Sequence, residues 1–251
     1  MTSSPPPASG RKIFIVGTGR SGTHWLGHIL QAHPLIHVTV EAPPIFAWAT
    51  EMAVDPRRKP LVMPLLVQRY EQEHLAVSPR HYADKSHPNI WHAEDLAERL
   101  PDAVFVGIQR NPFATVASML KHPGVLGWHD RWREFPVPNR FLGITAENAG
   151  EYDALPQAAR CALRWKSHAE RMAKLQTSLG GRLLVIGYED LILRPDAEVA
   201  RLTAFLGMAT PIPVPAIKAE SLDRWRRELS VEVQRQIATI AGVPPDICLS
   251  P

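Results

Sequence analysis

The segment KIFIVGTGRSGTHWL, residues 12–26, constrains the fold more than any other part of the chain. Its first six residues form an apolar run of the kind found in a buried parallel strand, and residues 23–32 predict a helix. Gly17 ends the strand, and Gly19 and Gly22 fall in the loop between strand and helix. A strand, a glycine loop and a helix in succession leave backbone N–H groups at the helix start, where a phosphate group binds. The segment therefore predicts an α/β fold with a phosphate-binding loop.

Apolar runs bounded by glycine, proline and polar residues continue this alternation along the chain. The expected strands are residues 12–17, 35–41, 81–86 at a sheet edge, 103–109 and 182–188. The expected helices are residues 23–32, 45–53, 90–100, 112–120, 157–179 and 198–206, with a closing segment at 221–240. Residues 121–156 are irregular and indicate a long functional loop or lid. The pattern predicts the α/β class, with a central, mainly parallel sheet flanked by helices in a P-loop-like nucleotide-binding fold.

Composition limits the classes of function. With 251 residues, 45% of them hydrophobic, the chain can bury a large core, and we expect a disordered tail at residues 1–10 and a single domain at 11–251. A formal charge of +3 suits anionic ligands but is too small to indicate nucleic acid as a partner. Cys161 and Cys248 are the only cysteines and lie far apart, so we expect neither a disulfide framework nor a thiolate metal site. The sequence has no signal-peptide core and no membrane-length apolar run, which favours the cytoplasm; the oligomeric state stays open.

The glycine loop fits two familiar fingerprints. One is the dinucleotide pattern G-x-G-x-x-G, supported by Glu41, which lies 19 residues after Gly22 where a ribose-binding acid belongs. This interpretation predicts an NAD(P)- or FAD-binding oxidoreductase. The other is most of a P-loop, which would indicate a nucleotide kinase or phosphotransferase. A P-loop requires Lys and then Ser or Thr after Gly22, whereas this chain has Thr23 and His24, so the main charge clamp on a transferred phosphoryl group is missing.

A third interpretation uses two separate anion sites. The loop would bind one phosphate through backbone N–H groups and the helix dipole, with Arg20 and Thr23 adding side-chain donors. The segment VFVGIQRNPFATVASMLKH supplies the second site, because Arg110 leaves the end of a strand there. Ser118 lies seven residues after the expected N-cap Asn111 and so on the same helix face. Together they form a cation and hydroxyl clamp for a second phosphate.

This combination resembles the sulfotransferase family, which uses 3'-phosphoadenosine 5'-phosphosulfate (PAPS). GTGRSGTHWL is similar to the family's 5'-phosphosulfate loop and RNPFATVASM to its 3'-phosphate motif. Residues 188–207 and 221–229 are similar to later segments of the family, the second of which covers the cofactor. The resemblance implies a bacterial enzyme, nearer to the protein-tyrosine and carbohydrate branch than to the cytosolic small-molecule branch. Such an enzyme moves a sulfuryl group from PAPS to a hydroxyl or amine of a small-molecule, carbohydrate or peptide acceptor, releases PAP and needs no metal.

The resemblance also implies roles for individual residues. Glu41 matches the catalytic base, with His24 and His87 as rivals, and Lys85 matches the lysine near the bridging oxygen. The residues that match the nucleotide-binding positions are Gly19, Arg20, Ser21, Gly22, Thr23, His24, Arg110, Ser118, Tyr188 and Arg224. Several of them also have a structural alternative: Glu41 can cap a turn, Lys85 can be a solvated loop residue, and Tyr188 can pack in the core. Without a functional base, the chain would be a PAP-binding protein that does no chemistry.

Aromatic residues crowd the irregular stretch after the 3'-phosphate motif. They either line an acceptor pocket or form the small core of a lid, and both interpretations stay open. His122 and His129 lie among them without a companion set for a metal. The remaining members of this group are Trp128, Trp132, Phe135 and Phe141.

Overall fold

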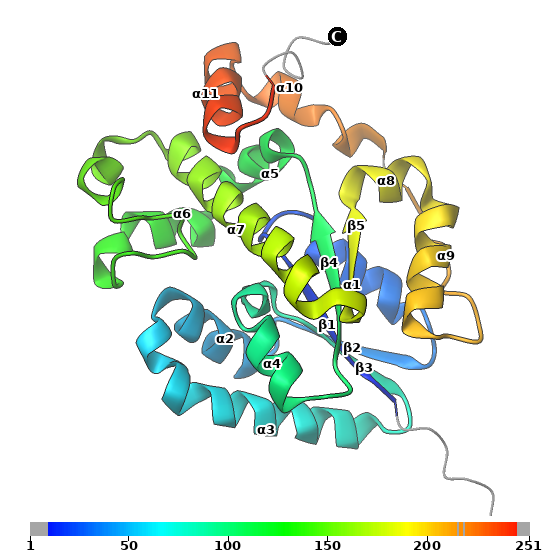
Figure 1. Ribbon diagram of the computed structural model, residues 1–251. Helices are drawn as coiled ribbons and strands as arrows, with labels where there is room; N and C mark the ends of the chain where they lie inside the picture. The colour runs from blue at the N-terminus through cyan, green and yellow to red at the C-terminus, as the bar shows by residue number, and fades with distance from the viewer. Residues whose placement is uncertain (1–9, 215, 218, 245–251) are drawn as a thin grey trace, which may run out of the picture.

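A five-stranded parallel sheet forms the centre of the protein (Figure 1). The computed structural model describes residues 10–214, 216–217 and 219–244. Strand order is β2-β3-β1-β4-β5, and every pair of neighbours runs parallel. The predicted fold class is therefore confirmed. The strands are β1 (Lys12–Gly17), β2 (Ile36–Val40), β3 (His81–Lys85), β4 (Val104–Gln109) and β5 (Leu183–Gly187).

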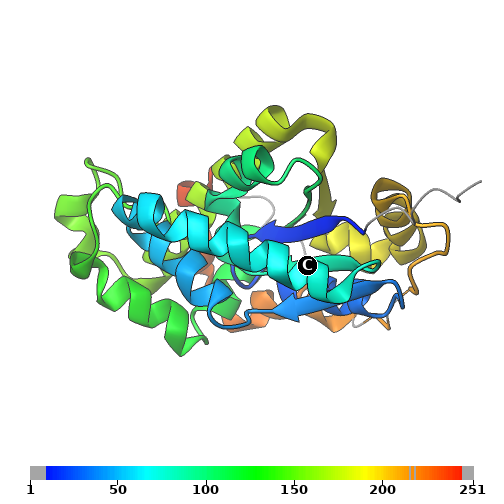
Figure 2. The same cartoon turned by 90° about the horizontal axis from the view of Figure 1, so that it is seen from below.

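Helices cover both faces of the sheet, as the view from below shows (Figure 2). One face packs against α1 (Thr23–Gln31), α8 (Tyr188–Leu193) and α9 (Pro195–Leu206). The opposite face packs against α2 (Ile45–Val54), α3 (Lys59–Val77), α4 (Ala93–Arg99) and α7 (Gln157–Leu179). A further cluster joins α7 to α5 (Pro112–Met119), α6 (Pro123–Asp130), α10 (Arg224–Glu228) and α11 (Val231–Ala241). The 3-10 helices are η1 (Pro56–Arg58), η2 (His87–Trp91), η3 (Trp132–Glu134), η4 (Ala149–Ala154), η5 (Gly180–Arg182) and η6 (Ala219–Ser221).

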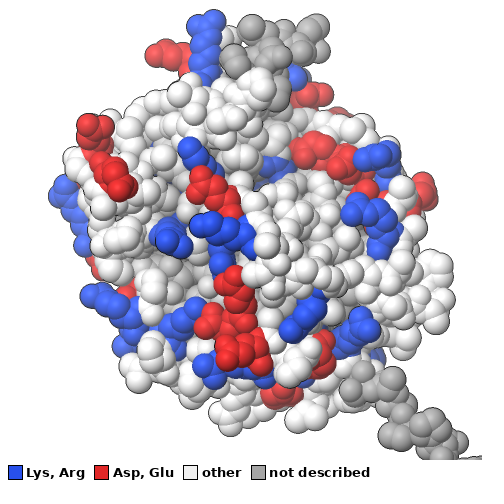
Figure 3. All heavy atoms as spheres, in the orientation of Figure 1, with Lys and Arg blue, Asp and Glu red and all other residues white. Residues whose placement is uncertain are grey.

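The surface carries both signs of charge. On the face shown in Figure 3, Lys and Arg side chains are interspersed with Asp and Glu, so the formal charge of +3 is not gathered into one patch there. Within the described ranges, no helix is long and apolar enough to cross a bilayer, and no group of three or more His, Cys, Asp and Glu side chains is arranged to hold a metal ion. Cys161 is buried and unpaired, while Cys248 lies outside the described residues.

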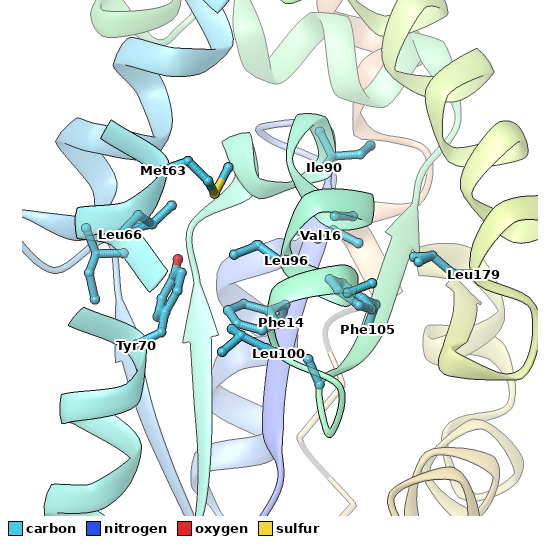
Figure 4. Close-up of a cluster of buried hydrophobic side chains, with 14 of the residues drawn as sticks. Phe14, Val16, Met63, Leu66, Tyr70, Ile90, Leu96, Leu100, Phe105 and Leu179 are labelled. Carbon is cyan, nitrogen blue, oxygen red and sulfur yellow. The ribbon is translucent and has the colours of Figure 1, made fainter. Parts of the chain in front are cut away.

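The central strand explains why the sheet is buried on both sides. Phe14 and Val16 of β1 point into the core under α3, α4 and α7, while Ile13 and Ile15 point into the core over α1. In Figure 4, Phe14 lies beside Phe105 of β4, with Tyr70 of α3 nearby. The rings of Phe14 and Phe105 stack with centroids 5.5 Å apart. Because alternate residues of β1 are buried on opposite faces, the strand has to be a continuous apolar run.

Three expectations from the sequence need correction. Residues 81–86 are not at an edge, because β3 lies between β2 and β1 with residues 82–85 buried. Residues 121–156 are not a plain loop: α6 begins at Pro123, and His122 caps it by accepting a hydrogen bond from the N–H of Val125. The closing segment breaks into α10 and α11 where the Ser230 side chain caps a new helix.

Two further segments differ from the expectation. The 19-residue helix α3 was not predicted at all. Residues 1–9 of the expected tail lie outside the described residues, whereas Gly10 is buried and its carbonyl oxygen lies 2.6 Å from Nε2 of His74.

Candidate active site

The glycine loop connects β1 to α1 at the carboxyl end of the central strand. Arg20 and Gly22 both have left-handed backbone conformations, with φ of 77° and 100°. A Cβ atom on Gly22 would lie 2.5 Å from the Tyr188 ring, so only glycine fits there. Ser21 stiffens the loop from inside, because its hydroxyl donates to the carbonyl of Thr18 at 2.6 Å. No described side chain caps α1 at Gly22, so the first N–H groups of this helix are available to bind an anion.

The segment after β4 supplies the second predicted anion clamp. Asn111 caps α5 by accepting a 2.8 Å hydrogen bond from the N–H of Ala114. Its own side-chain amide donates to Glu189 at 2.7 Å, which joins the start of α5 to α8. This arrangement brings Ser118 near the glycine loop, where its hydroxyl oxygen accepts a 3.2 Å hydrogen bond from Nε of Arg20. The two anion motifs, 98 residues apart in sequence, are therefore in direct contact.

Arg110 is held beside this contact by two interactions. Its guanidinium stacks on the Tyr188 ring at 4.1 Å, and Nη2 donates to the carbonyl of Ser221 at 2.7 Å. The Tyr188 hydroxyl in turn donates to the Ser221 hydroxyl at 3.0 Å. Nε of Arg110 is buried and has no hydrogen-bond partner among the described residues. A buried donor of this kind is suited to an anionic ligand.

These side chains surround a cavity of about 350 Å³, which we call the anion pocket. Three arginines lie around it. An adjoining cavity of about 340 Å³ shares Trp25 and Tyr188 with it and is also lined by Ile192, Ala216 and Ser221. The anion pocket is lined by Arg20, Gly22, Thr23, His24, Trp25, Arg110, Ser118, Tyr188 and Arg224.

A second pocket of about 180 Å³, the carboxylate pocket, contains the Glu41 side chain. Glu41 directly follows β2 with a left-handed φ of 48°, and Lys85 is the last residue of the neighbouring β3. Nζ of Lys85 donates to Oε1 of Glu41. Nδ1 of His87 lies 3.4 Å from the same oxygen, and Nε2 of His24 lies 3.9 Å from Oε2. The pocket is lined by Gly19, Arg20, His24, Glu41, Phe46, Lys85, His87, His122, Gly124, Val125 and Trp128.

Burial and mutual contacts set the protonation of these groups. Burial alone would raise the pKa of Glu41, but hydrogen bonds from His87 and Lys85 outweigh it and lower this pKa to about 2, so Glu41 is ionised. Burial lowers the pKa of Lys85, and the Glu41 carboxylate opposes that shift. Burial also lowers the pKa of His87 to about 4, which makes its ring neutral. The pKa of His24 is lowered by burial and then by the Lys85 charge.

The two pockets meet at Arg20 and His24, which line both of them. The structure thus gathers the residues singled out in the sequence around one continuous site. Gly19 and Lys85 belong to the carboxylate pocket, and Arg110, Ser118, Tyr188 and Arg224 to the anion pocket. Ser21 lies beneath the loop with its hydroxyl turned to backbone carbonyls.

The aromatic stretch divides between a pocket wall and a buried cluster. Trp128 lines the carboxylate pocket, and a role in acceptor binding stays a prediction. Trp132 and Phe141 are buried with Tyr152 in an apolar cluster that also includes the end of α2, and Phe135 packs against it. His129 is buried there as well, with Nδ1 2.6 Å from the Tyr152 hydroxyl.

Sequence reasoning missed Arg164, a fully buried arginine of α7 next to His87. A signal for it exists: Cys161, Arg164, His168 and Met172 recur at helical spacing on the buried face of α7. A charged residue on such a stripe points to a special role. Phe46 of α2, which lines the carboxylate pocket, was also missed because apolar helix residues are common in any core.

Comparison with known proteins agrees with this geometry. The sequence profile of the sulfotransferase family matches residues 12–211. Nodulation protein NoeE of Sinorhizobium fredii is 27% identical over 275 residues, covering 91% of this chain and 63% of NoeE, so the chain spans less than two thirds of that relative. Protein-tyrosine sulfotransferase 1 of Danio rerio is 21% identical, with 91% and 69% covered. The sulfotransferase domain of the Synechococcus PCC 7002 olefin synthase has the same fold, with a TM-score of 0.58, 18% identity, and 96% and 97% covered. The chain belongs to the sulfotransferase family.

Proposed function

We propose that this protein transfers a sulfuryl group from PAPS to an acceptor hydroxyl or amine, with Glu41 as the base. The observation that carries the proposal is the junction of the two pockets at Arg20 and His24. One pocket is cationic and suits a nucleotide with two anionic groups, and the other presents a carboxylate and a buried lysine. A group bound in both would place its reacting atom between the cations and the base, as in-line transfer requires.

The anion pocket fits the donor in its chemistry. The 5'-phosphosulfate would bind at the start of α1, where backbone N–H groups and the helix dipole attract anions, with Thr23 and Arg20 as additional donors. Arg110 and Ser118 would hold the 3'-phosphate, and the unpartnered Nε of Arg110 supports this role. The adjoining cavity beside Trp25 and Tyr188 has aromatic walls that suit the nucleoside.

The chain's own residues would carry the proton and stabilise the charge. PAPS supplies the activated sulfuryl group. The acceptor oxygen or nitrogen forms a bond to sulfur as the bond from sulfur to the 5'-phosphate oxygen breaks, and the bonding electrons leave with PAP. Glu41 accepts the acceptor's proton, while Lys85 and Arg20 neutralise charge on the sulfuryl and bridging oxygens. His24, which lines both pockets, would contact the transferred group.

The Lys85–Glu41 pair makes the base dependent on the donor. A carboxylate whose pKa is about 2 is a weak base at neutral pH. If Lys85 turns to a sulfuryl oxygen, Glu41 loses that hydrogen bond and its burial raises its pKa. Donor binding would thus strengthen the base at the moment it is needed. The same pair argues against the dinucleotide interpretation, because Glu41 bonds Lys85 rather than standing ready for a ribose.

The acceptor would enter the carboxylate pocket, whose walls include Phe46, Val125 and Trp128. Such walls suit an acceptor that brings an apolar or aromatic surface next to its hydroxyl or amine. A small-molecule, carbohydrate or peptide acceptor all remain within the proposal, and the cytoplasmic location stays a prediction.

A thermal-shift comparison tests the donor. The purified protein would be heated alone and with PAP, ATP plus Mg²⁺, NAD or NADP, because a ligand of the native state raises the melting temperature. We expect selective stabilisation by PAP and a much smaller shift in Arg110→Ala at the same PAP concentration. The matched control Arg99→Ala, at an exposed arginine on α4, should respond to PAP like the wild type. A shift with NAD or ATP but none with PAP would contradict the proposal.

A further inference from the structure

Arg164 on α7 is a buried cation without an anionic partner among the described residues. Its side chain is fully buried, and its guanidinium lies 4.7 Å from the Trp128 ring and 4.3 Å from the Phe141 ring. Nε and Nη1 are buried without a hydrogen-bond partner in the described parts of the chain. Burial lowers the pKa of Arg164 to about 10, so the group is still charged at neutral pH. A buried charge with unpaired donors destabilises a fold, so a role other than stability explains its position better.

The remaining nitrogen of Arg164 faces His87. Nη2 lies 3.5 Å from Nε2 of His87, a long contact in a fully buried setting. A guanidinium has only donors, so Nε2 of His87 has to act as the acceptor in this contact. The proton of the neutral ring is then on Nδ1, which lies 3.4 Å from Oε1 of Glu41. Arg164, His87 and Glu41 thus form a chain of directed contacts that ends at the proposed base.

The His87 ring has little freedom to turn. Phe46 and Phe141 lie beside it, with ring centroids at 5.7 Å and 6.3 Å. The glycine loop packs against the other side of the ring, because a Cβ atom on Gly19 would lie only 3.1 Å from Nε2 of His87. With the ring orientation fixed by packing, the position of its single proton decides whether His87 supports Glu41.

We propose that Arg164 is a positioning residue that holds His87 in the Nδ1–H form and, through it, orients the Glu41 carboxylate. The inference rests on the proposed function only in taking Glu41 as the base. It also assigns His87 a supporting role: its acceptor nitrogen faces Arg164, so it has no lone pair to offer a substrate. When Lys85 turns to the donor, the His87 N–H is the hydrogen bond that keeps Glu41 in place.

The other charged and titratable neighbours of His87 do not compete for Nε2. Lys85 of β3 donates to Glu41. Nε2 of His168, on α7, accepts a 3.1 Å hydrogen bond from Nε1 of Trp91, so the proton of the His168 ring is on Nδ1. Nδ1 donates this proton to the carbonyl oxygen of Arg164 at 2.8 Å. Two groups therefore favour the Nδ1–H form of His87: the Glu41 carboxylate accepts from Nδ1, and Arg164 donates to Nε2.

Nitrogen NMR of the full chain, with histidines labelled by ¹⁵N and no nucleotide present, tests this assignment. Signals of His87 would be identified by their loss in His87→Asn. In the wild type we expect a protonated Nδ1 and an unprotonated Nε2. In Arg164→Met, which keeps the volume but removes the donor, the ratio of the two tautomers should move toward Nε2–H by about tenfold or more, the equivalent of one charge-assisted hydrogen bond.

Arg171→Met is the matched control on the same helix. Arg171 contacts Trp91 and Glu94 rather than His87, so this variant should leave the His87 tautomer unchanged. A wild-type His87 in the Nε2–H form, or an unchanged ratio in folded Arg164→Met, would overturn the proposal. If Arg164→Met does not fold, an Nε2–H form of His87 in the wild type would still overturn the proposal.

PAP titration of the same samples separates this inference from the proposed function. Absence of PAP binding beside the expected tautomers would sink the donor assignment and leave Arg164 as the group that orients His87. PAP binding together with an Nε2–H form of His87 would support the donor assignment and overturn the role of Arg164.

Discussion

The anion pocket and the carboxylate pocket differ in whether their charged groups already have partners. The anion pocket keeps a donor without a partner among the described residues, Nε of Arg110, and its Arg224 side chain is 57% exposed in a surface ion pair with Glu228. The carboxylate pocket buries its charges and satisfies them internally, with the Lys85 side chain only 1% exposed and paired to Glu41. A donor without a partner can bind an anion at once, whereas a buried ion pair has to exchange partners before it reacts. The comparison teaches that binding and chemistry are separable here, and mutations should separate them.

Glu41→Gln should cause the largest effect. The amide keeps the shape of the side chain but cannot take a proton, so transfer from radiolabelled PAPS to phenol, whose hydroxyl is protonated at neutral pH, should fall by about 10²–10⁴-fold. The affinity for PAP should change little, because Glu41 does not line the anion pocket. Full turnover in this variant would remove Glu41 as the base and end the distinction between the pockets.

Acid should weaken the carboxylate region through His87. The pKa of His87 is about 4 in the folded protein, below the ordinary value of 6.5, so the unfolded chain takes up the proton first as the pH falls. The contribution of His87 to the free energy of unfolding is fully present above about pH 6.5. It is lost as the pH falls toward 4, to a total of about 3 kcal/mol. Chemical denaturation of the wild type and of His87→Asn over this range measures it. Equal pH dependence in the two proteins would contradict a buried, neutral His87.

Arg110→Ala should damage binding rather than chemistry. Loss of a charge-assisted contact weakens PAP affinity by about 10- to 100-fold, while turnover at saturating PAPS falls much less. Steady-state kinetics in PAPS would measure both quantities. A loss of turnover with unchanged KM for PAPS would place Arg110 in the chemical step instead.

Arg164→Met should lower turnover by about tenfold with an unchanged KM for PAPS, because it acts on the base through His87. Its melting temperature should equal or exceed that of the wild type, since an apolar side chain of similar volume replaces a buried, poorly paired charge. Kinetics and melting of the same preparation test both parts. A large loss of stability with unchanged turnover would make Arg164 a purely structural residue.

Ser118→Ala should produce the smallest effect. The hydroxyl is one neutral partner in the anion pocket and also accepts a hydrogen bond from Arg20, so PAP affinity should fall by about fivefold. Calorimetric titration can resolve that difference. A loss as large as that of Arg110→Ala would show that Ser118 organises Arg20 rather than simply touching the phosphate.

The anion pocket was largely predictable from sequence because its residues follow buried strands within short segments. Arg20 comes soon after β1, Arg110 directly after β4 and Tyr188 directly after β5, and parallel strands end at the same edge of a sheet. The strands themselves were predictable because burial on both faces makes each a continuous apolar run. The anion pocket could therefore be predicted without knowledge of how side chains pack.

The interior of the carboxylate pocket was not predictable in the same way. Arg164 contacts His87 across 77 residues, and no local pattern announces that contact. Helix α3 was missed for a related reason. Val62, Leu66, Tyr70 and His74 form its buried stripe, but leucines on its exposed side obscure the period; these are Leu61, Leu65 and Leu75.

Calorimetric titration of PAP into three proteins, the wild type, Arg110→Ala and Glu41→Gln, tests the division between the pockets most directly. The account predicts specific binding to the wild type, nearly the same affinity in Glu41→Gln and a loss of at least about tenfold in Arg110→Ala. No binding to the wild type, or equal losses in the two variants, would contradict it.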